Sequence, residues 1–382
     1  MSHAILSPSS SGRWLVCTRS AQLEAKEPYS SSVYADEGTL AHRLCELLVK
    51  YKIGKMLNKD FKKHLKEIEA HELYTGEMYD YCDGFAVFVL EKFNSLAGAH
   101  IFTEDKVDLT RWIPQGFGTV DIRIIGGKTL FIIDFKYGKG VPVFAEDNSQ
   151  LKVYGLGAVE EMSHLFNIDT VEMIIYQPRI GSVTSHTMKT IDLLEWAETV
   201  LVPGAKAAYE GAGEFVPGAH CGFCRVRHKC KALAAKNLEA AKEAFKEPAF
   251  LSPDEVADIV KREKAFTDWI SAVSDYALEQ AVNHGVEWPG MKLVEGRSVR
   301  KYADDEQAAS ALIKAGLNPT KIYNLKLKGI TEMTKLLGKT DFEKVLGEHL
   351  IKPVGKPVLV DETDKRPAFS SVDRAQEAFK EE

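Results

Sequence analysis

The 382-residue sequence contains no apolar run long enough to span a membrane, and Met1–Trp14 lack the apolar core of a signal peptide. Without a secretion signal, the six cysteines fit a reducing compartment better than a disulfide framework. We therefore expect a cytoplasmic protein that does not enter a membrane.

An excess of basic charge is also absent, since the formal net charge is -6. This excludes a uniformly basic nucleic-acid coat, so any contact with DNA would need a local groove. Gly-Lys-Thr occurs at Gly127 and at Gly338, but neither has the first glycine of a P-loop five residues upstream. The sequence thus lacks the phosphate-binding loop of a motor ATPase. Its 45% apolar and 27% charged residues are typical of a soluble globular protein, and its length allows two domains.

The most informative stretch is Gln115–Gly155, which we predict to be a β-hairpin followed by a helix. Thr129–Ile133 is almost continuously apolar, which indicates a strand covered on both faces. Asp134 and Lys136 follow this strand, and burying such groups without partners is costly. This cost is the first indication of a functional site.

The hairpin brings a second carboxylate close to Asp134. If Gly126-Gly127 forms a two-residue turn, Asp121 lies opposite Ile132, with Asp134 as its diagonal neighbour on one face. Diagonal neighbours are roughly 7–8 Å apart, so the two carboxylates could hold Mg²⁺ or Mn²⁺ together with a phosphate and a water. Lys136, on the same face, would stabilise charge on the phosphoryl oxygens or help to activate the water.

A structural interpretation of these aspartates is the alternative: each ends a strand and pairs with Lys136 or Arg123. For a lone Asp-x-Lys this interpretation would be preferred, because the pattern occurs by chance in most chains of this length. Here the pattern follows a buried strand and has a second acid in register, which favours a metal site.

The remaining periodicity predicts helices, a three-strand meander, a helix and further strands, hence an α/β core with a mixed sheet flanked by helices. Cys17 falls in a short helix, Gly12–Leu23. His42 falls in a helix over Asp36–Tyr51, near its buried leucines, where a satisfied core histidine is the default interpretation. The other expected elements are helices at Thr75–Ser95, around Gln150 and at Asp192–Tyr209, and strands at Ile101–Leu109 (with Glu104), Val171–Pro178 and Val183–Thr190.

Three cysteines follow the last of these helices with the spacing C-x₂-C-x₅-C, namely Cys221, Cys224 and Cys230. Three thiols so close together in a cytosolic chain are typical of a metal site. The spacing leaves the fourth ligand open, and His220 and His228 are candidates for a Cys₃His zinc site.

Together these residues resemble the RecB-like branch of the PD-(D/E)XK nucleases, in particular the iron–sulfur exonucleases of the CRISPR-associated and AddB-like kind, in a phage-encoded group. The resemblance covers Ser7–Ala235, and its motifs occur in family order. They are Cys17, the helical His42, the strand Glu104, Gly118-x-x-Asp121, Asp134-x-Lys136, Gln150-x-x-x-Tyr154, and the cysteines Cys221, Cys224 and Cys230. Each motif alone is weak, but the ordered set is specific.

The resemblance implies a restriction-endonuclease-like core with a catalytic metal ion. The implied ligands of this Mg²⁺ or Mn²⁺ are His42, Asp121, Asp134 and the carbonyl of Phe135. Glu104 would support the metal or its water, and Lys136 would be the catalytic lysine. Gln150 and Tyr154, one helical turn apart, would face the DNA strand.

The resemblance also gives the cysteines a common role. The implied ligands of a [4Fe–4S] cluster are Cys17, Cys221, Cys224 and Cys230. Such a cluster would pin the first helix to the segment after the core, and Zn²⁺ bound by the cysteines is the alternative. Cys45 and Cys82 match no motif and are expected to be buried small residues.

The expected activity is metal-dependent exonucleolytic hydrolysis of DNA phosphodiesters in phage or prokaryotic recombination, replication or repair. The expected partners are DNA and recombination or replication proteins of the phage or its host, whose cytoplasm would contain the protein. The alternatives are a non-catalytic DNA-end-binding iron–sulfur subunit of a larger complex and a structural zinc protein.

Three regions are expected: the nuclease core with its cluster at 1–235, a mainly helical module at 236–352, and an extended or partly disordered tail at 353–382. The module should begin with an Ala/Glu/Lys-rich helical stretch to about Asn283 and contain a strand at Trp288–Tyr302. Several of its lysines either solvate short helices or form a surface for DNA or a replication partner. They are Lys321, Lys326, Lys328 and Lys335.

Overall fold

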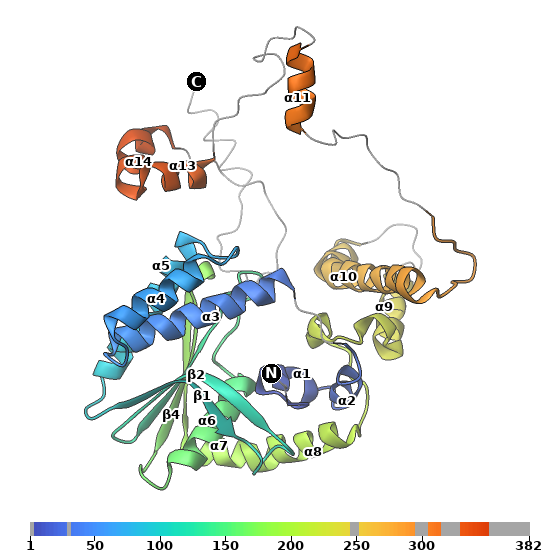
Figure 1. The fold of residues 1–382 in the computed structure, drawn as a ribbon. Helices are drawn as coiled ribbons and strands as arrows, with labels where there is room; N and C mark the ends of the chain where they lie inside the picture. The colour runs from blue at the N-terminus through green and yellow to red at the C-terminus, as the bar shows by residue number, and fades with distance from the viewer. Residues whose placement is uncertain (1–3, 29–31, 245–251, 295–304, 315–328, 351–382) are drawn as a thin grey trace. The chain divides into compact units, whose positions relative to one another are not determined.

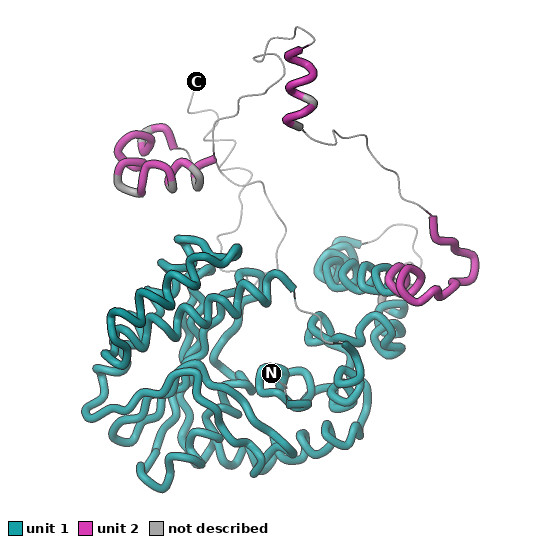
Figure 2. Tube along the Cα trace, viewed as in Figure 1, with its two compact units in different colours: residues 1–276 teal, residues 277–382 magenta. Residues whose placement is uncertain are grey.

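The computed structural model describes residues 4–28, 32–244, 252–294, 305–314 and 329–350. The chain divides into two compact units, residues 1–276 and 277–382 (Figure 2). The first unit contains a five-stranded sheet with helices, and the described part of the second is mainly helical. The predicted α/β fold and helical C-terminal part are therefore confirmed. None of the described helices combines the length and apolarity needed to cross a membrane.

The strands of the sheet lie in the order of the chain, from β1 to β5. β3 and β4 are parallel and all other neighbours are antiparallel, so the sheet is mixed, as predicted. Helix α6 (Ser149–Met162) makes the crossover between the two parallel strands. The strands are β1 His100–Asp108, β2 Phe117–Gly126, β3 Thr129–Phe135, β4 Thr170–Gln177 and β5 Ser182–Lys189.

Helices cover the sheet (Figure 1), and an apolar core lies on each of its two faces. One, called here the α3–α5 core, includes Ile133 and Phe135 of β3, and the other, the α6 core, includes Ile132. β3 is thus buried on both faces, which explains its continuous apolar sequence. The helices of the first core are α3 Val33–Lys52, α4 Asn58–Glu69 and α5 Gly76–Asn94; α3 and α5 begin at the side-chain caps Ser32 and Thr75.

The N-terminal segment differs from the single helix expected over Gly12–Leu23. It forms two short helices, α1 (Ser11–Trp14) and α2 (Ser20–Glu24), and Cys17 lies between them. The turn between these helices is bonded to distant backbone, because the Thr18 hydroxyl donates to the carbonyl of Ala212 at 2.6 Å. A long-range contact of this kind is invisible to helix periodicity.

The helix expected over Asp192–Tyr209 is also interrupted. It consists of α7 (Thr190–Trp196), a π-helical segment (Ala197–Leu201) and α8 (Val202–Glu210). The interruption precedes Pro203, which lacks the N–H that a continuous helix requires.

The predicted turn of the β2–β3 hairpin, Gly126-Gly127, is wrong by one residue. Gly126 pairs with Thr129, so the turn is Gly127-Lys128, and Gly127 has the positive φ of 57°. Gly126 stays in the strand, where a Cβ atom would lie 2.8 Å from Cβ of Leu96. Moving the turn by one residue leaves the facing of both strands unchanged. Ile122 pairs with Ile133 at the end of this ladder, and Asp121 and Asp134 are the next residues of the two strands.

The C-terminal helices are α9 Lys231–Ala244, α10 Pro253–His284, α11 Asp305–Lys314, α13 Ile330–Leu337 and α14 Lys339–Leu346. The strand expected at Trp288–Tyr302 is not found in its described part, residues 288–294, where Gly290 forms a turn with φ 74°. Residues 295–302, the tail at 353–382, and Lys321, Lys326 and Lys328 lie outside the described residues.

Candidate metal centre and cysteine site

Three carboxylates lie in a row across neighbouring strands. In the β1–β2 register, Thr103 pairs with Ile122 and Asp105 pairs with Val120, which puts Glu104 opposite Asp121. Asp121 and Asp134 are in turn the residues that follow the last β2–β3 pair, Ile122–Ile133. The sequence predicted that Asp121 and Asp134 are neighbours, and the structure adds Glu104 as a third acid.

The backbone is distorted where this row crosses β1 and β2. Glu104 has a φ of 48°, a conformation that is costly for a residue other than glycine. Ile122 packs in the α3–α5 core, whereas Val120, two residues away, packs in the α6 core. Residues two apart in a regular strand share a face, so the facing of β2 reverses beside Asp121. Such strain, held in place by the surrounding fold, is typical of functional sites.

His42 reaches the row from α3. Its Nδ1 lies 3.4 Å from Oδ1 of Asp121 and 3.8 Å from Oε1 of Glu104. Ligand atoms of these three residues all lie within 4.8 Å of one another, which makes them a possible metal-binding triad. The His42 side chain is 32% exposed. It therefore differs from the enclosed core histidine that was the default interpretation.

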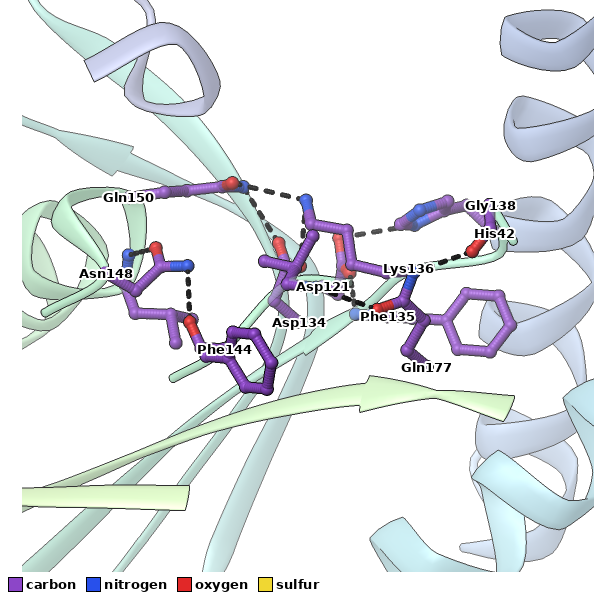
Figure 3. A network of polar contacts seen from close by, with 12 residues as sticks. His42, Asp121, Asp134, Phe135, Lys136, Gly138, Phe144, Asn148, Gln150 and Gln177 are labelled. Atoms are coloured by element: carbon purple, nitrogen blue, oxygen red, sulfur yellow. Dashed lines mark hydrogen bonds and ion pairs between the residues drawn. The ribbon is translucent and has the colours of Figure 1, made fainter. Parts of the chain in front are cut away.

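Asp134 forms a second group with Lys136 and Gln150, adjoining the first (Figure 3). The Nζ of Lys136 lies 2.9 Å from Oδ2 of Asp134, while Nε2 of Gln150 donates to Oδ1 at 2.8 Å. Lys136 Nζ also donates to Oε1 of Gln150 at 3.2 Å. The N–H of Phe135 donates to Oδ2 of Asp121 at 2.8 Å, which connects the two groups. Oδ2 of Asp134 is buried and, beside its charge contact with Lys136, makes no hydrogen bond.

The pKa values of the two aspartates are shifted in opposite directions. Burial raises the pKa of Asp134, and the neighbouring Asp121 adds to this effect, outweighing the positive charge of Lys136. Burial also acts to raise the pKa of Asp121, but His42 and the N–H of Phe135 bring it below its usual range. Burial likewise raises the pKa of Glu104 against the opposing effect of His42. Close carboxylates whose pKa values are shifted in this way are suited to binding a cation.

The two basic groups are held in their charged forms. Burial acts to lower the pKa of His42, but Asp121 and Glu104 raise it well above its usual value. Burial opposes the charge of Lys136 too, and the contact with Asp134 nevertheless raises its pKa. Lys136 is therefore a cation at neutral pH.

Gln150 and Tyr154 lie on the same side of α6 but in different surroundings. Gln150 contacts Asp134 and Lys136 directly. Tyr154 is 6% exposed and packs so closely that a Cβ atom on Gly118 would lie 2.8 Å from its ring. Burial and the charge of Asp134 raise the pKa of Tyr154. Contact of these two residues with DNA stays a prediction.

The cysteines singled out by the sequence surround one cavity. It is lined by Cys17 from the N-terminal segment, by the three later cysteines and by Arg13 and His220. Burial raises the pKa of Cys221, and burial together with Glu24 raises that of Cys224 to about 12. Cys45 and Cys82 are buried elsewhere, between α3 and α5, as expected.

The sulfur atoms are not drawn into a single tight group. Within the described part of the chain, no three of the four cysteines bring their sulfurs within 4.8 Å of one another. His220, a candidate zinc ligand, has Nε2 2.9 Å from the carbonyl of Val216. His228 stacks on Tyr276 with ring centroids 4.3 Å apart.

Glu24 connects the two parts of this cysteine site, and no sequence motif pointed to it. Glu24 is 5% exposed, and its carboxylate accepts from Nε of Arg13 at 2.8 Å and from the N–H of Arg225 at 2.7 Å. Arg225 directly follows Cys224, so this one side chain ties the N-terminal segment to the cysteine loop.

Glu24→Ala should lower the free energy of unfolding by about 3 kcal/mol, because it leaves Arg13 and a backbone N–H without their buried partner. The measurement is urea unfolding followed by circular dichroism. Glu160→Ala is the matched control, since the Glu160–Arg111 ion pair is half-exposed and should contribute less than about 1 kcal/mol. Equal effects of the two substitutions would contradict the bridging role of Glu24.

Comparison with known proteins gives a family and a distant structural neighbour. A solved structure described as "Crystal structure of SSO0001" matches with 13% sequence identity and a TM-score of 0.25, over 58% of this chain and 96% of that chain. A family model for proteins of unknown function, DUF2800, matches residues 3–367. This match spans nearly the whole sequence. The chain therefore belongs to the DUF2800 family.

Proposed function

We propose that this protein is a Mg²⁺- or Mn²⁺-dependent DNA exonuclease of the RecB-like PD-(D/E)XK type, acting in phage or prokaryotic recombination, replication or repair. The observation that carries the proposal is the row of three carboxylates on β1, β2 and β3, joined by His42 and ending at Lys136. Oxygen and imidazole donors within 4.8 Å of one another fit such an ion.

The chain's own residues would divide the work as follows. His42, Asp121 and Glu104 would hold the ion, with Asp134 and the carbonyl of Phe135 completing its protein ligands. When bound, the ion supplies Lewis acidity for the phosphate and a more acidic water. Lys136, kept protonated beside Asp134, stabilises negative charge on the phosphoryl oxygens, which favours that role over proton removal. Gln150 orients both Asp134 and Lys136.

For the cysteines we propose a [4Fe–4S] cluster in place of zinc. Tetrahedral zinc bonds of about 2.3 Å would require sulfurs roughly 3.8 Å apart. Among the described cysteines, no three sulfurs lie within 4.8 Å of one another. A polynuclear cluster tolerates wider spacing because each cysteine binds a different iron. The cluster would join the N-terminal segment to the end of the core.

The direct test is incubation of the purified protein with end-labelled single-stranded and double-stranded DNA and Mg²⁺ or Mn²⁺. Lys136→Ala should lower turnover by a factor on the order of 10²–10³ while Mn²⁺ binding persists, because it removes a cation and no ligand. Lys139→Ala, which changes an exposed lysine three residues away, is the control and should cleave normally. Binding of DNA ends without cleavage by the wild type would instead support the non-catalytic end-binding subunit.

A further inference from the structure

The chain between β3 and α6 forms a loop that begins and ends at the candidate site. Lys136 follows the last residue of β3, and Gln150 lies in the first turn of α6. The side chains of these two residues bond to each other at 3.2 Å and so close the base of the loop. The conformation of Tyr137–Asn148 therefore affects where both of them lie.

Backbone pairing does not hold this loop. The N–H of Lys136 donates to the carbonyl of Tyr176 at 2.9 Å, which extends the β3–β4 pairing by one residue. Beyond that bond the chain leaves the sheet. It contains two exposed glycines, Gly138 and Gly140, whose backbones have wide conformational freedom. A different interaction must fix the loop.

Side chains of the sheet supply it: the Thr184 hydroxyl accepts from the N–H of Ala145 at 3.0 Å, and Gln177, the last residue of β4, makes three further bonds (Figure 3). It is 1% exposed, and its Nε2 donates to the carbonyls of Gly138 at 2.7 Å and Val141 at 2.9 Å. Its Oε1 accepts from the N–H of Val143 at 3.0 Å. The oxygen and both hydrogens of one amide are thus engaged, all with backbone groups of the loop.

The pattern is specific to glutamine. Glutamate has the same shape but no N–H, so it would present a carboxylate to two carbonyl oxygens. Methionine has a similar length but would leave three backbone groups without partners. Neither substitution would change a residue to which the mechanism above gives a role.

We propose that Gln177 is a positioning residue: it fixes the loop Tyr137–Asn148 and thereby holds Lys136 and Gln150 beside Asp134. The catalytic consequence rests on the proposed nuclease function, whereas the placement of Lys136 does not. The two can therefore be tested separately.

The placement is tested by the reactivity of Lys136 toward an amine-acylating reagent, followed by mass spectrometry. In Gln177→Met and Gln177→Glu, Lys136 should be acylated about tenfold faster than in the wild type, because it loses the constraint of the loop. Ile175→Val, a fully buried change in the same strand, should leave the rate unchanged. Wild-type reactivity in both Gln177 variants, or faster reaction in the control as well, overturns the proposal.

A measurement on the wild type does not depend on how well the variants fold. Amide hydrogen exchange at Val143 should be slow, because Gln177 Oε1 accepts from this N–H. Exchange as fast as that of an exposed loop overturns the proposal.

The catalytic consequence is tested by steady-state kinetics on DNA. Both Gln177 variants should lose about tenfold or more in kcat with little change in KM, since misplacing a catalytic group by about 1 Å can cost on the order of 10²-fold. An unchanged kcat in variants with a reactive Lys136 overturns the positioning role. If the wild type cleaves no DNA, the nuclease function fails, while the acylation result still decides the placement of Lys136.

Discussion

Asp121→Asn and Asp134→Asn should each lower metal-dependent cleavage by a factor on the order of 10²–10³ or more, yet they should change thermal stability in opposite directions. The pKa of Asp121 is lowered in the fold, so its ionised form adds stability at neutral pH, which the Asn variant loses. The pKa of Asp134 is raised, so its ionisation costs stability above the unfolded-state pKa, and Asp134→Asn removes this cost.

The measurement is nuclease activity alongside thermal melts without added metal. Asp121→Asn should melt below the wild type and Asp134→Asn at or above it. Asp169→Asn is the control, because Asp169 is an exposed acid beside the opposite end of β4, paired with Lys128. Full cleavage by both site variants would show that these aspartates are structural and that the nuclease assignment fails.

Loss of the proposed cluster is the second large effect. Serine substitution of any one of the four cysteines should abolish bound iron and the broad visible absorbance, because all four line one cavity. The variants are Cys17→Ser, Cys221→Ser, Cys224→Ser and Cys230→Ser. Cys45→Ala and Cys82→Ala are matched controls from the α3–α5 core and should retain full iron content. Iron analysis and the absorbance spectrum of the purified proteins provide the measurement.

The cysteine variants should keep the N-terminal segment in place. The N-terminal segment does not depend on the cluster and weak packing alone, because Glu24, Gln22 and Thr18 bond it to the distant chain. It should therefore stay resistant to limited proteolysis in the iron-free variants. If Cys17→Ser keeps its metal while His220→Ala loses it, the site binds zinc and the cluster proposal is wrong.

The helices and strands of the core were predictable because the spacing of their apolar residues reflects which face is buried. The apolar run of β3 and the leucine stripe of α3 each reflect a core that the strand or helix faces. The turn of the hairpin was not predictable to the residue. Gly126 and Gly127 both suit a turn, but Gly126 pairs with Thr129 in the strand and packs closely against Leu96. That contact is tertiary.

In the candidate site, too, some residues could be predicted from the sequence and others could not. Asp134 and Lys136 were identifiable because a buried strand ends in charged residues. The strained φ of Glu104 left no local signal, and neither did the roles of Gln177 and Glu24, because a single Gln or Glu acquires meaning only from its partners. Spacing also could not connect Cys17 with the later cysteines, and only the resemblance did.

The bonds between the N-terminal segment and the cysteine loop also constrain how the protein is made. Glu24 and the N–H of Arg225 are 201 residues apart in the chain. Because translation runs from the N-terminus, Glu24 leaves the ribosome long before its partner exists. A segment that is synthesised before the rest of the sheet unit is thus among the last of that unit to reach its final place. The proposed cluster on the four cysteines could be assembled only after Cys230 has emerged, so its insertion would follow translation of the whole five-stranded sheet.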